Sequence, residues 1–267
     1  MNRMNRRSFL TLNAISAAGF YIQGEVFGIL PPHQRLQRAI VSPSVATSGA
    51  FDPTAPGSVW GYWKAGTGIT QSANAVSAWA DQSGNNHHLT QATGANQPTY
   101  ATAQLNGFPS ITFDGTNDFL TSGGYDATFA QPFSLVAVCK PITWIDNCQI
   151  LSGQGGSGIW QYSATPILME YAGGGLAVQV SPTINTWIVL IAVFNGTSSF
   201  LQVGTSAPVA GANTSHTSPM QDMEMGSKYD GTHTSNVAFV EAISFKKALS
   251  SGEANTIGAG YKSKFVI

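Results

Sequence analysis

Few residues in this chain are of types and spacings that could do chemistry, and the clearest are two acids at alternate positions, Asp222 and Glu224. On a strand, residues two apart share a face. A pair of carboxylates facing a sugar is what a glycosidase uses, one as proton donor and the other as base or nucleophile. Met220 stands where a third acid would extend the row. Since no nucleophile completes the set, we interpret both acids as solvent-exposed strand residues and predict no catalytic residue.

The other motifs that could indicate catalysis or cofactor binding also lack the residues or the context that they need. The glycine-rich stretch Gly153–Gly158 matches G-x-G-x-x-G, but the strand-like Ile159–Tyr162 follows where phosphate binding needs a helix N-terminus, so we expect a hairpin loop. The sequence contains no G-x-S-x-G motif for serine hydrolysis. Cys139 and Cys148 are not at zinc spacing with a second pair. They flank a hairpin-like segment, which leaves a disulfide and two separate buried thiols as alternatives.

Three aromatic residues are candidates for sugar contacts. Trp160 and Tyr162 would share one strand face just after the glycine-rich loop, and Trp144 lies in the loop at Lys140–Asn147. Aromatic rings bind the apolar side of a sugar, while nearby amides or carboxylates bind its hydroxyl groups. The alternative for each ring is ordinary core or loop packing.

Composition narrows the fold class. The chain has 267 residues, of which 43% are hydrophobic and 9% charged, with a formal net charge of −1. This balance argues against broad binding to nucleic acid, and the longest apolar run, Trp187–Phe194, is too short for a membrane span. Turn residues separate many short strand-like segments, which predicts an all-β sandwich or jelly roll. The expected strands are Val59–Trp63, Ser110–Phe113, Phe133–Lys140, Gln149–Ser152, Ile159–Tyr162, Pro166–Tyr171, Leu176–Val180, Thr186–Phe194, Phe200–Val203, Gln221–Met225 and Ala238–Phe245.

Only the C-terminus has a helical pattern. Ser250 and Glu253 have the spacing of a capping box, in which each side chain bonds the backbone N–H of the other residue. Gly258 and Gly260 weaken a helix. We therefore expect a short helix of one or two turns, packed on the sandwich.

Charge divides the chain into an arm and a body. All five arginines lie within residues 1–38, and the Pro-, Gly- and Ser-rich segment Ser42–Gly57 follows them. We interpret 1–50 as a basic arm with a linker to about residue 57, and 58–267 as one domain. Arg6-Arg7 before an apolar stretch fits a twin-arginine export signal. The alternative is an attached arm that packs against a partner.

Two segments predict turns rather than a site. Asp81, followed by Ser83–Asn85, has the pattern of an Asx turn, in which the carboxylate accepts backbone N–H groups. Asp114-Gly115 has the same character after a strand. Trp79 beside the first turn is expected to be a core residue.

The same segments carry a family resemblance. The chain resembles the laminin-G-like branch of the concanavalin A-like jelly rolls across residues 58–267. Asn117 departs from the pattern, because the family more often has a second Asp there. The similarity rests on Trp79–Asn85, Gln91–Thr93, Pro98–Tyr100, Asn106–Pro109, Phe113–Leu120, Ala238–Ala242 and Leu249–Tyr261.

The resemblance implies a two-sheet antiparallel jelly roll of the kind found in bacterial surface proteins and in bacteriophage virion and tail proteins. It also implies that calcium could bind at the rim of the sandwich, where Asp126 and Asp230 are the available loop acids. Nothing in their spacing singles them out as ligands. No other cofactor is expected.

These observations lead to an expected function. We predict a non-enzymatic attachment or decoration protein on a virion surface, which displays a carbohydrate-binding type of jelly roll. One alternative is a secreted, extracellular bacterial carbohydrate-binding protein, and another is a polysaccharide hydrolase or lyase. Glycans would bind at Trp160, Tyr162 and Trp144. The arm would bind other virion or surface-assembly proteins through Phe9, Phe20, Arg35 and Arg38.

Overall fold

The computed structural model describes residues 51–123, 128–154, 157–164, 166, 168–172, 176–211, 218–228 and 230–267. These residues belong to one compact unit. The arm at 1–50, with Phe9, Phe20, Arg35 and Arg38, lies outside them, so its role stays a prediction. In the part of the chain described, no helix is long and apolar enough to cross a membrane.

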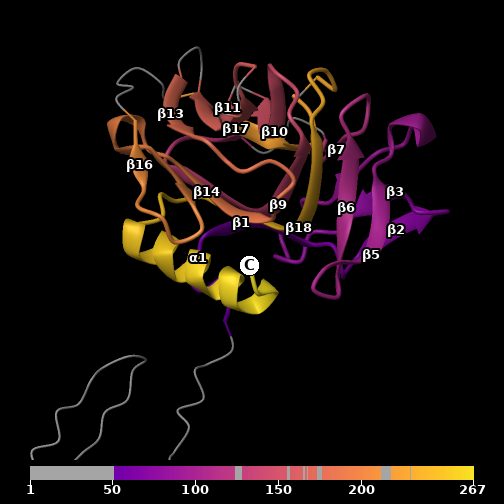
Figure 1. Ribbon diagram of the computed structural model, residues 1–267, viewed down its shortest axis with the longest axis horizontal. Coiled ribbons are helices and arrows are strands. Elements are labelled where there is room, and N and C mark those ends of the chain that lie inside the picture. Colours follow the sequence, from indigo (N-terminus) through magenta and orange to yellow (C-terminus); the bar gives the residue numbers. More distant parts are fainter. Residues whose placement is uncertain are drawn as a thin grey trace, which may run out of the picture. The chain divides into compact units, whose positions relative to one another are not determined.

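Strands dominate this unit, and every strand pairing is antiparallel (Figure 1). The prediction of an all-β fold is therefore confirmed. The elements are β1 (Val59–Lys64), β2 (Ile69–Ser72), β3 (Ala75–Trp79), β4 (Leu89–Thr90), β5 (Thr99–Leu105), β6 (Phe108–Asp114), β7 (Leu120–Thr121), β8 (Thr128–Phe129), β9 (Phe133–Thr143), β10 (Cys148–Gln154), β11 (Ser157–Gln161), β12 (Leu168–Ala172), β13 (Leu176–Val180), β14 (Ile188–Phe194), β15 (Phe200–Val203), β16 (Val209–Ala210), β17 (Met220–Met225), β18 (Asn236–Phe245) and α1 (Ser251–Phe265).

The central layer is built on the most apolar strands. β14 pairs with β9 along its whole length, and β9 pairs with β18. The other edge of β18 is shared, since β6 pairs with its first half and β1 with its second. All seven residues of β14 are buried, as expected of a strand covered on both faces.

A second layer runs β13–β12–β11–β10–β17–β7 and packs on the central layer (Figure 1). β5, β3 and β4 connect the two layers, so the strands form a single hydrogen-bonded network. The main hydrophobic core lies between the layers, where Phe133 of β9 stacks on Phe194 of β14 at 4.4 Å between ring centroids. Alternation along β9 sends Leu135 into this core and Val136 to the opposite face.

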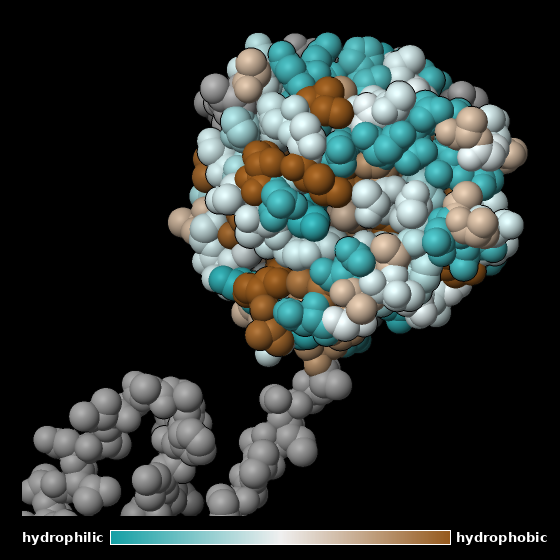
Figure 2. Space-filling view, turned by 45° about the vertical axis from the view of Figure 1, so that its right-hand side comes forward, coloured by the Kyte–Doolittle hydropathy of each residue, from teal (hydrophilic) through white to brown (hydrophobic). Residues whose placement is uncertain are grey.

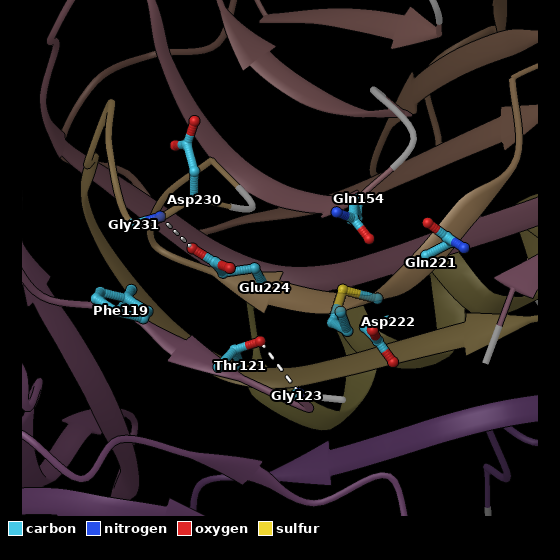
Figure 3. A pocket seen from close by; sticks show the side chains of 11 residues that line it. Phe119, Thr121, Gly123, Gln154, Gln221, Asp222, Glu224, Asp230 and Gly231 are labelled. Atoms are coloured by element: carbon cyan, nitrogen blue, oxygen red, sulfur yellow. Dashed lines mark hydrogen bonds between the residues drawn. The ribbon is translucent and has the colours of Figure 1, made fainter. Parts of the chain in front are cut away.

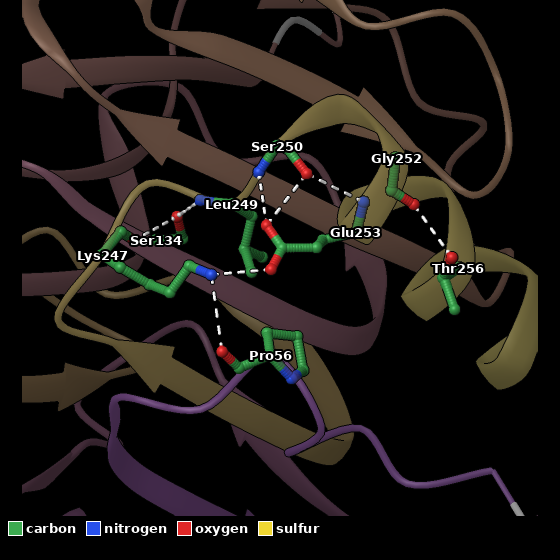
Figure 4. Close-up of polar contacts among 8 residues, drawn as sticks. All are labelled: Pro56, Ser134, Lys247, Leu249, Ser250, Gly252, Glu253 and Thr256. Carbon is green, nitrogen blue, oxygen red and sulfur yellow. Dashed lines mark hydrogen bonds and ion pairs between the residues drawn. The ribbon is translucent and has the colours of Figure 1, made fainter.

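The helix α1 covers that opposite face. Ile257, Tyr261 and Phe265 of the helix pack against apolar residues of β9, β14 and β18. The predicted capping box is present, with Ser250 at the N-cap and Glu253 at the third helical position (Figure 4).

The helix has 15 residues, which corrects the expectation of one or two turns. A Cβ on Gly258 would lie 2.2 Å from the carbonyl oxygen of Gly204, and one on Gly260 would overlap the ring of Phe51. These glycines therefore allow close approach between the helix and its neighbours, and the packing they permit offsets their low helix propensity.

The Asx turn predicted at Asp81 is present. Asp81 is buried and accepts hydrogen bonds from the backbone N–H of Tyr62 (2.8 Å), Ser83 (2.8 Å) and His87 (3.1 Å). Burial alone would raise the pKa of Asp81, but these bonds outweigh burial and lower it. Trp79 is fully buried in the main core. Both are structural, as predicted.

The two cysteines are free thiols, so the disulfide alternative is wrong. Cys139 lies on β9 inside the main core and Cys148 begins β10. Burial raises the pKa of the Cys148 thiol to about 11, which keeps it protonated. The glycine-rich motif joins β10 to β11, which are paired strands, as expected of a hairpin rather than a phosphate loop.

On the face shown in Figure 2, apolar residues form small separate patches among polar ones. Among the described residues, the large apolar side chains that are exposed are Tyr162, Val209 and Val266.

Candidate functional site

A pocket of about 280 Å³ opens where β17 lies between β7 and β10 (Figure 3). The segment after β17, which contains Asp230 and Gly231, forms one wall, and Phe119 and Thr121 form another. Gln154 at the end of β10 lines a further side. The floor is β17 itself, which contributes residues 221–224.

A break in register sets the geometry of β17. Ser152 of β10 pairs with Glu224, whereas Gln154 pairs with Gln221, so three steps along β17 match two along β10. Asp222 has a left-handed φ of 56°. This combination is a β-bulge, which re-aims side chains at the strand.

The bulge corrects the prediction that Asp222 and Glu224 are solvent-exposed acids on one strand face. Both are buried, with 7% and 4% of their surface exposed, and both line the pocket. Figure 3 shows their carboxyl groups pointing in different directions. Met220, Met223 and Met225 remain in the main core, so a strand expected to expose its acids has its apolar side chains inside and its acids in a cavity.

A sequence signal for this bulge exists. Met220 and Met223 are three apart, whereas Met223 and Met225 are two apart, and a regular strand would keep the core residues at even spacing. The odd step marks the extra residue.

Glu224 has hydrogen-bond donors on one carboxyl oxygen only. The hydroxyl of Ser227 and the backbone N–H of Gly231 (3.2 Å) both donate to Oε1. Oε2 accepts no hydrogen bond within the described part of the chain. Burial raises the pKa of Glu224 to about 7, although the two hydrogen bonds oppose this, and the negative charge of Asp230 adds to the rise. Near neutral pH the group can therefore hold a proton and release it.

The pKa of Asp230 shifts in the opposite direction to that of Glu224. Burial favours a higher pKa, but hydrogen bonds from Thr232 and Lys228 outweigh it and lower the pKa. Lys228 Nζ lies 3.0 Å from Oδ2, and the Thr232 backbone N–H lies 3.1 Å from Oδ1. Figure 3 shows the Asp230 carboxylate turned away from Glu224. The pocket thus carries one carboxyl that holds its proton near pH 7 and one that is ionised, a combination that supports acid–base chemistry.

The predicted aromatic residues lie outside this pocket. Trp160 on β11 is half-buried and meets Tyr162 edge to face, with ring centroids 6.0 Å apart. Tyr162 is 39% exposed. Trp144 packs against the main core, and its indole N–H donates to the backbone oxygen of Ser163 at 2.8 Å. Trp160 and Tyr162 are thus brought together, while Trp144 is held by loop packing.

The calcium site implied by the resemblance has one residue to examine, since Asp126 lies outside the described residues. Asp230 is ion-paired with Lys228 instead. Among the residues described, no group of three or more acidic, histidine or cysteine side chains is placed to hold a metal ion.

Comparisons with known proteins find a likeness to solved structures alone. No family model and no curated sequence matches the chain. A GH54 α-L-arabinofuranosidase soaked with a cyclic sulfate inhibitor is similar in structure, with 16% identity and a TM-score of 0.55 over 72% of this chain and 51% of that one. A mutant of Trypanosoma rangeli sialidase that displays trans-sialidase activity has 15% identity and a TM-score of 0.51 over 82% of this chain and 35% of that one.

This finding corrects the expectation of a non-enzymatic attachment or decoration protein, because the similar structures are glycosidases. The chain spans about half the length of the arabinofuranosidase and about a third of the sialidase, so the likeness concerns one part of each enzyme. At about 15% identity the likeness establishes the fold, and an assignment of activity must rest on the pocket.

Proposed function

We propose that this protein is a carbohydrate-active enzyme with a concanavalin A-like jelly roll, and that it cleaves glycosidic bonds in the pocket around Glu224. The observation that carries the proposal is the pair of carboxyl groups in that pocket, one with a pKa of about 7 and one ionised. The shared fold with two glycosidases supports it.

Each step has a residue to perform it. The protonated Glu224 donates its proton to the glycosidic oxygen from Oε2, the oxygen that accepts no hydrogen bond from the residues that the structure describes. The bond between the anomeric carbon and that oxygen then breaks, and the bonding electrons leave with the oxygen. A water molecule adds to the anomeric carbon while Asp230, as the ionised acid, accepts its proton.

The remaining walls suit a sugar ring. Phe119 offers an aromatic surface, and the side-chain amides of Gln154 and Gln221 offer donors and acceptors for hydroxyl groups. Asp222 also lines the pocket and is the alternative second carboxylate.

The test is hydrolysis by the full chain, followed by chromatography of released sugars. The substrates are 4-nitrophenyl α-L-arabinofuranoside, arabinoxylan, barley β-glucan, polygalacturonate and sialyllactose. For the substrate that is cleaved, Glu224→Gln should lower kcat/KM by at least about 10²-fold. Asp230→Asn should do the same, whereas Asp52→Asn, an exposed acid outside the pocket, should leave the rate unchanged.

The outcomes separate the assignments. If Asp222→Asn abolishes cleavage and Asp230→Asn does not, the second carboxylate is Asp222. Undiminished cleavage by Glu224→Gln, or no cleavage of any of these substrates, would overturn the proposal.

A further inference from the structure

The hydroxyl group of Ser227 is a hydrogen-bond donor to Glu224. Ser227 lies two residues after the end of β17 and is fully buried, and its hydroxyl donates to Oε1 of Glu224. The backbone N–H of Gly231 donates to the same oxygen at 3.2 Å (Figure 3). Both donors therefore act on one end of the carboxyl group, and neither acts on Oε2.

The backbone around Ser227 is held by β10. The oxygen of Ser227 accepts a hydrogen bond from the hydroxyl of Ser152 at 2.8 Å, and the N–H of Gly226 donates to the oxygen of Ile150 at 3.0 Å. Gly226 has a left-handed φ of 85°, a conformation that favours glycine. Two bonds to a single strand thus fix the turn that brings the Ser227 hydroxyl back to Glu224.

The two donors decide which oxygen of Glu224 carries the proton. In a neutral carboxyl group, one oxygen is a carbonyl acceptor and the other carries the O–H. Because Oε1 accepts from both Ser227 and Gly231, it is the carbonyl oxygen, and the proton lies on Oε2. The proton is therefore on the oxygen from which it can be donated to a substrate.

The same donors stabilise the carboxylate that forms when the proton leaves. The electron pair of the Oε2–H bond stays on the carboxyl group, and its charge is shared with Oε1. Hydrogen bonds to an ionised acceptor are roughly twice as strong as those to a neutral one. The Ser227 hydroxyl has a second acceptor in reach, the backbone oxygen of Lys228 at 3.1 Å, and negative charge on Glu224 favours the bond to Oε1.

The charges around Glu224 act against its ionisation. Among the described residues that line this pocket, the other charged groups are Asp222 on β17 and Asp230, which is ion-paired with Lys228. The neighbouring strands β7 and β10 contain no acid, lysine or arginine. Burial and the charge of Asp230 raise the pKa of Glu224, and the two hydrogen bonds on Oε1 are the interactions that oppose this rise.

We propose that Ser227 is the positioning residue of the acid: its hydroxyl keeps the proton of Glu224 on Oε2 and stabilises the carboxylate that forms when this proton is transferred. The inference rests on the proposed function for the group that receives the proton. The effect of Ser227 on Glu224 can be measured without any substrate.

The first test titrates Glu224 by NMR in the full-length protein, with carbon-13 in the glutamate carboxyl groups. The signal that is absent from Glu224→Gln belongs to Glu224. Ser227→Ala removes a donor to the ionised form and should raise the titration midpoint by about one pH unit. Ser227→Cys keeps a weak donor and should raise it by less. An unchanged midpoint in either variant would overturn the proposal.

Ser235→Ala is the matched control. Ser235 is also fully buried, but its hydroxyl donates to the backbone oxygen of Gly226 at 3.4 Å rather than to Glu224. This variant should titrate at the same midpoint as the unsubstituted protein. Equal shifts in Ser235→Ala and Ser227→Ala would mean that altered packing, rather than a lost donor, moves the midpoint, and would also overturn the proposal.

The second test compares the 4-nitrophenyl and methyl glycosides of the sugar that the protein cleaves. Nitrophenolate leaves with little help from an acid, whereas an alkoxide needs the proton of Glu224. Ser227→Ala should therefore lower kcat for the methyl glycoside about three- to tenfold more than for the nitrophenyl glycoside, with little change in KM.

The pH profile gives a further readout. Since a higher pKa keeps the acid protonated to a higher pH, the basic limb of the rate profile should move upward in Ser227→Ala, together with the NMR midpoint. Equal losses of kcat with both leaving groups would overturn the role of Ser227 in proton transfer. A shifted midpoint in a protein that cleaves no glycoside would refute the hydrolase and retain the hold of Ser227 on Glu224.

Discussion

Two buried glutamates on neighbouring parts of the fold have opposite environments. Glu224 on β17 and Glu241 on β18 are both 4% exposed. Glu241 is held on both carboxyl oxygens, by the ammonium of Lys264 on Oε1 and by the hydroxyl of Tyr62 on Oε2 at 3.0 Å. Glu224 has two neutral donors, both on Oε1, and faces a pocket.

The difference separates a carboxylate that is paired within the fold from one that faces a pocket. Lys264 lies on α1 and Glu241 on the strand beneath, so their ion pair ties the helix to the sheet. Burial raises the pKa of Tyr62, and the negative charge of Glu241 raises it further, so the phenol remains a neutral donor. Burial raises the pKa of Glu224 to about 7, and none of the described residues forms an ion pair with it, so its proton can be gained and lost near pH 7.

The largest expected effect on stability comes from removing the cation on the helix side. Lys264→Met leaves the Glu241 carboxylate buried without its counter-charge and should cost roughly 2–4 kcal/mol of unfolding free energy in urea titrations. Lys262→Met, on the exposed side of the same helix, should change it by less than about 0.5 kcal/mol. If the two variants were equally stable, Glu241 would not depend on Lys264 and the contrast with Glu224 would collapse.

The next prediction concerns Glu224, whose substitution should raise the unfolding free energy rather than lower it. The folded-state pKa of Glu224, about 7, lies above its ordinary value of 4.5, so the unfolded chain binds fewer protons between these pH values and stability falls as pH rises. Glu224→Gln removes this penalty. The variant should match the unsubstituted protein near pH 4 and exceed its unfolding free energy by up to about 3 kcal/mol at pH 8.

Urea titrations at both pH values check this sign, and Glu241→Gln is the control. That variant loses the charge that Lys264 pairs with, so it should be less stable than the unsubstituted protein at pH 8. A loss of stability at pH 8 in Glu224→Gln would contradict the raised pKa.

The sequence predicted the features that depend on local chemistry. The strand at Trp187–Phe194, the Asx turn at Asp81 and the cap at Ser250 all form where expected, because each follows from the residues within it. β3 and β5 escaped prediction, because their sequences, AVSAW and TYATAQL, mix small, polar and apolar residues without a clear alternation. The predicted helix is shorter than the observed one because Gly258 has a low helix propensity. In the structure, the lack of a side chain at Gly258 lets the helix approach the backbone oxygen of Gly204, a contact that the local sequence does not reveal.

The site escaped prediction for a related reason. The burial of Glu224 depends on the bulge at Asp222, which arises in the pairing of β17 with the distant strand β10, and on the return of the chain at Gly231, seven residues further on. The residue type at position 220 therefore carries no information on whether Glu224 is buried. The prediction of a non-enzymatic protein followed from the lack of a nucleophile beside Asp222 and Glu224, of a G-x-S-x-G motif and of zinc spacing at the cysteines, together with the family resemblance.

The smallest expected effect on stability comes from the helix cap, which lies on the helix side of the molecule rather than on the pocket side. The hydroxyl of Ser250 accepts a hydrogen bond from the Glu253 N–H at 3.2 Å, and Glu253 also pairs with Lys247 at 2.6 Å (Figure 4). Ser250→Ala removes the cap but keeps the ion pair, and should cost about 1 kcal/mol in urea unfolding. Since the cap lies on the helix side and Glu224 on the pocket side, the pH dependence of stability between pH 4 and 8 should keep its slope. A changed slope would mean that the two regions are coupled, and that Glu224 senses the helix as well as its own pocket.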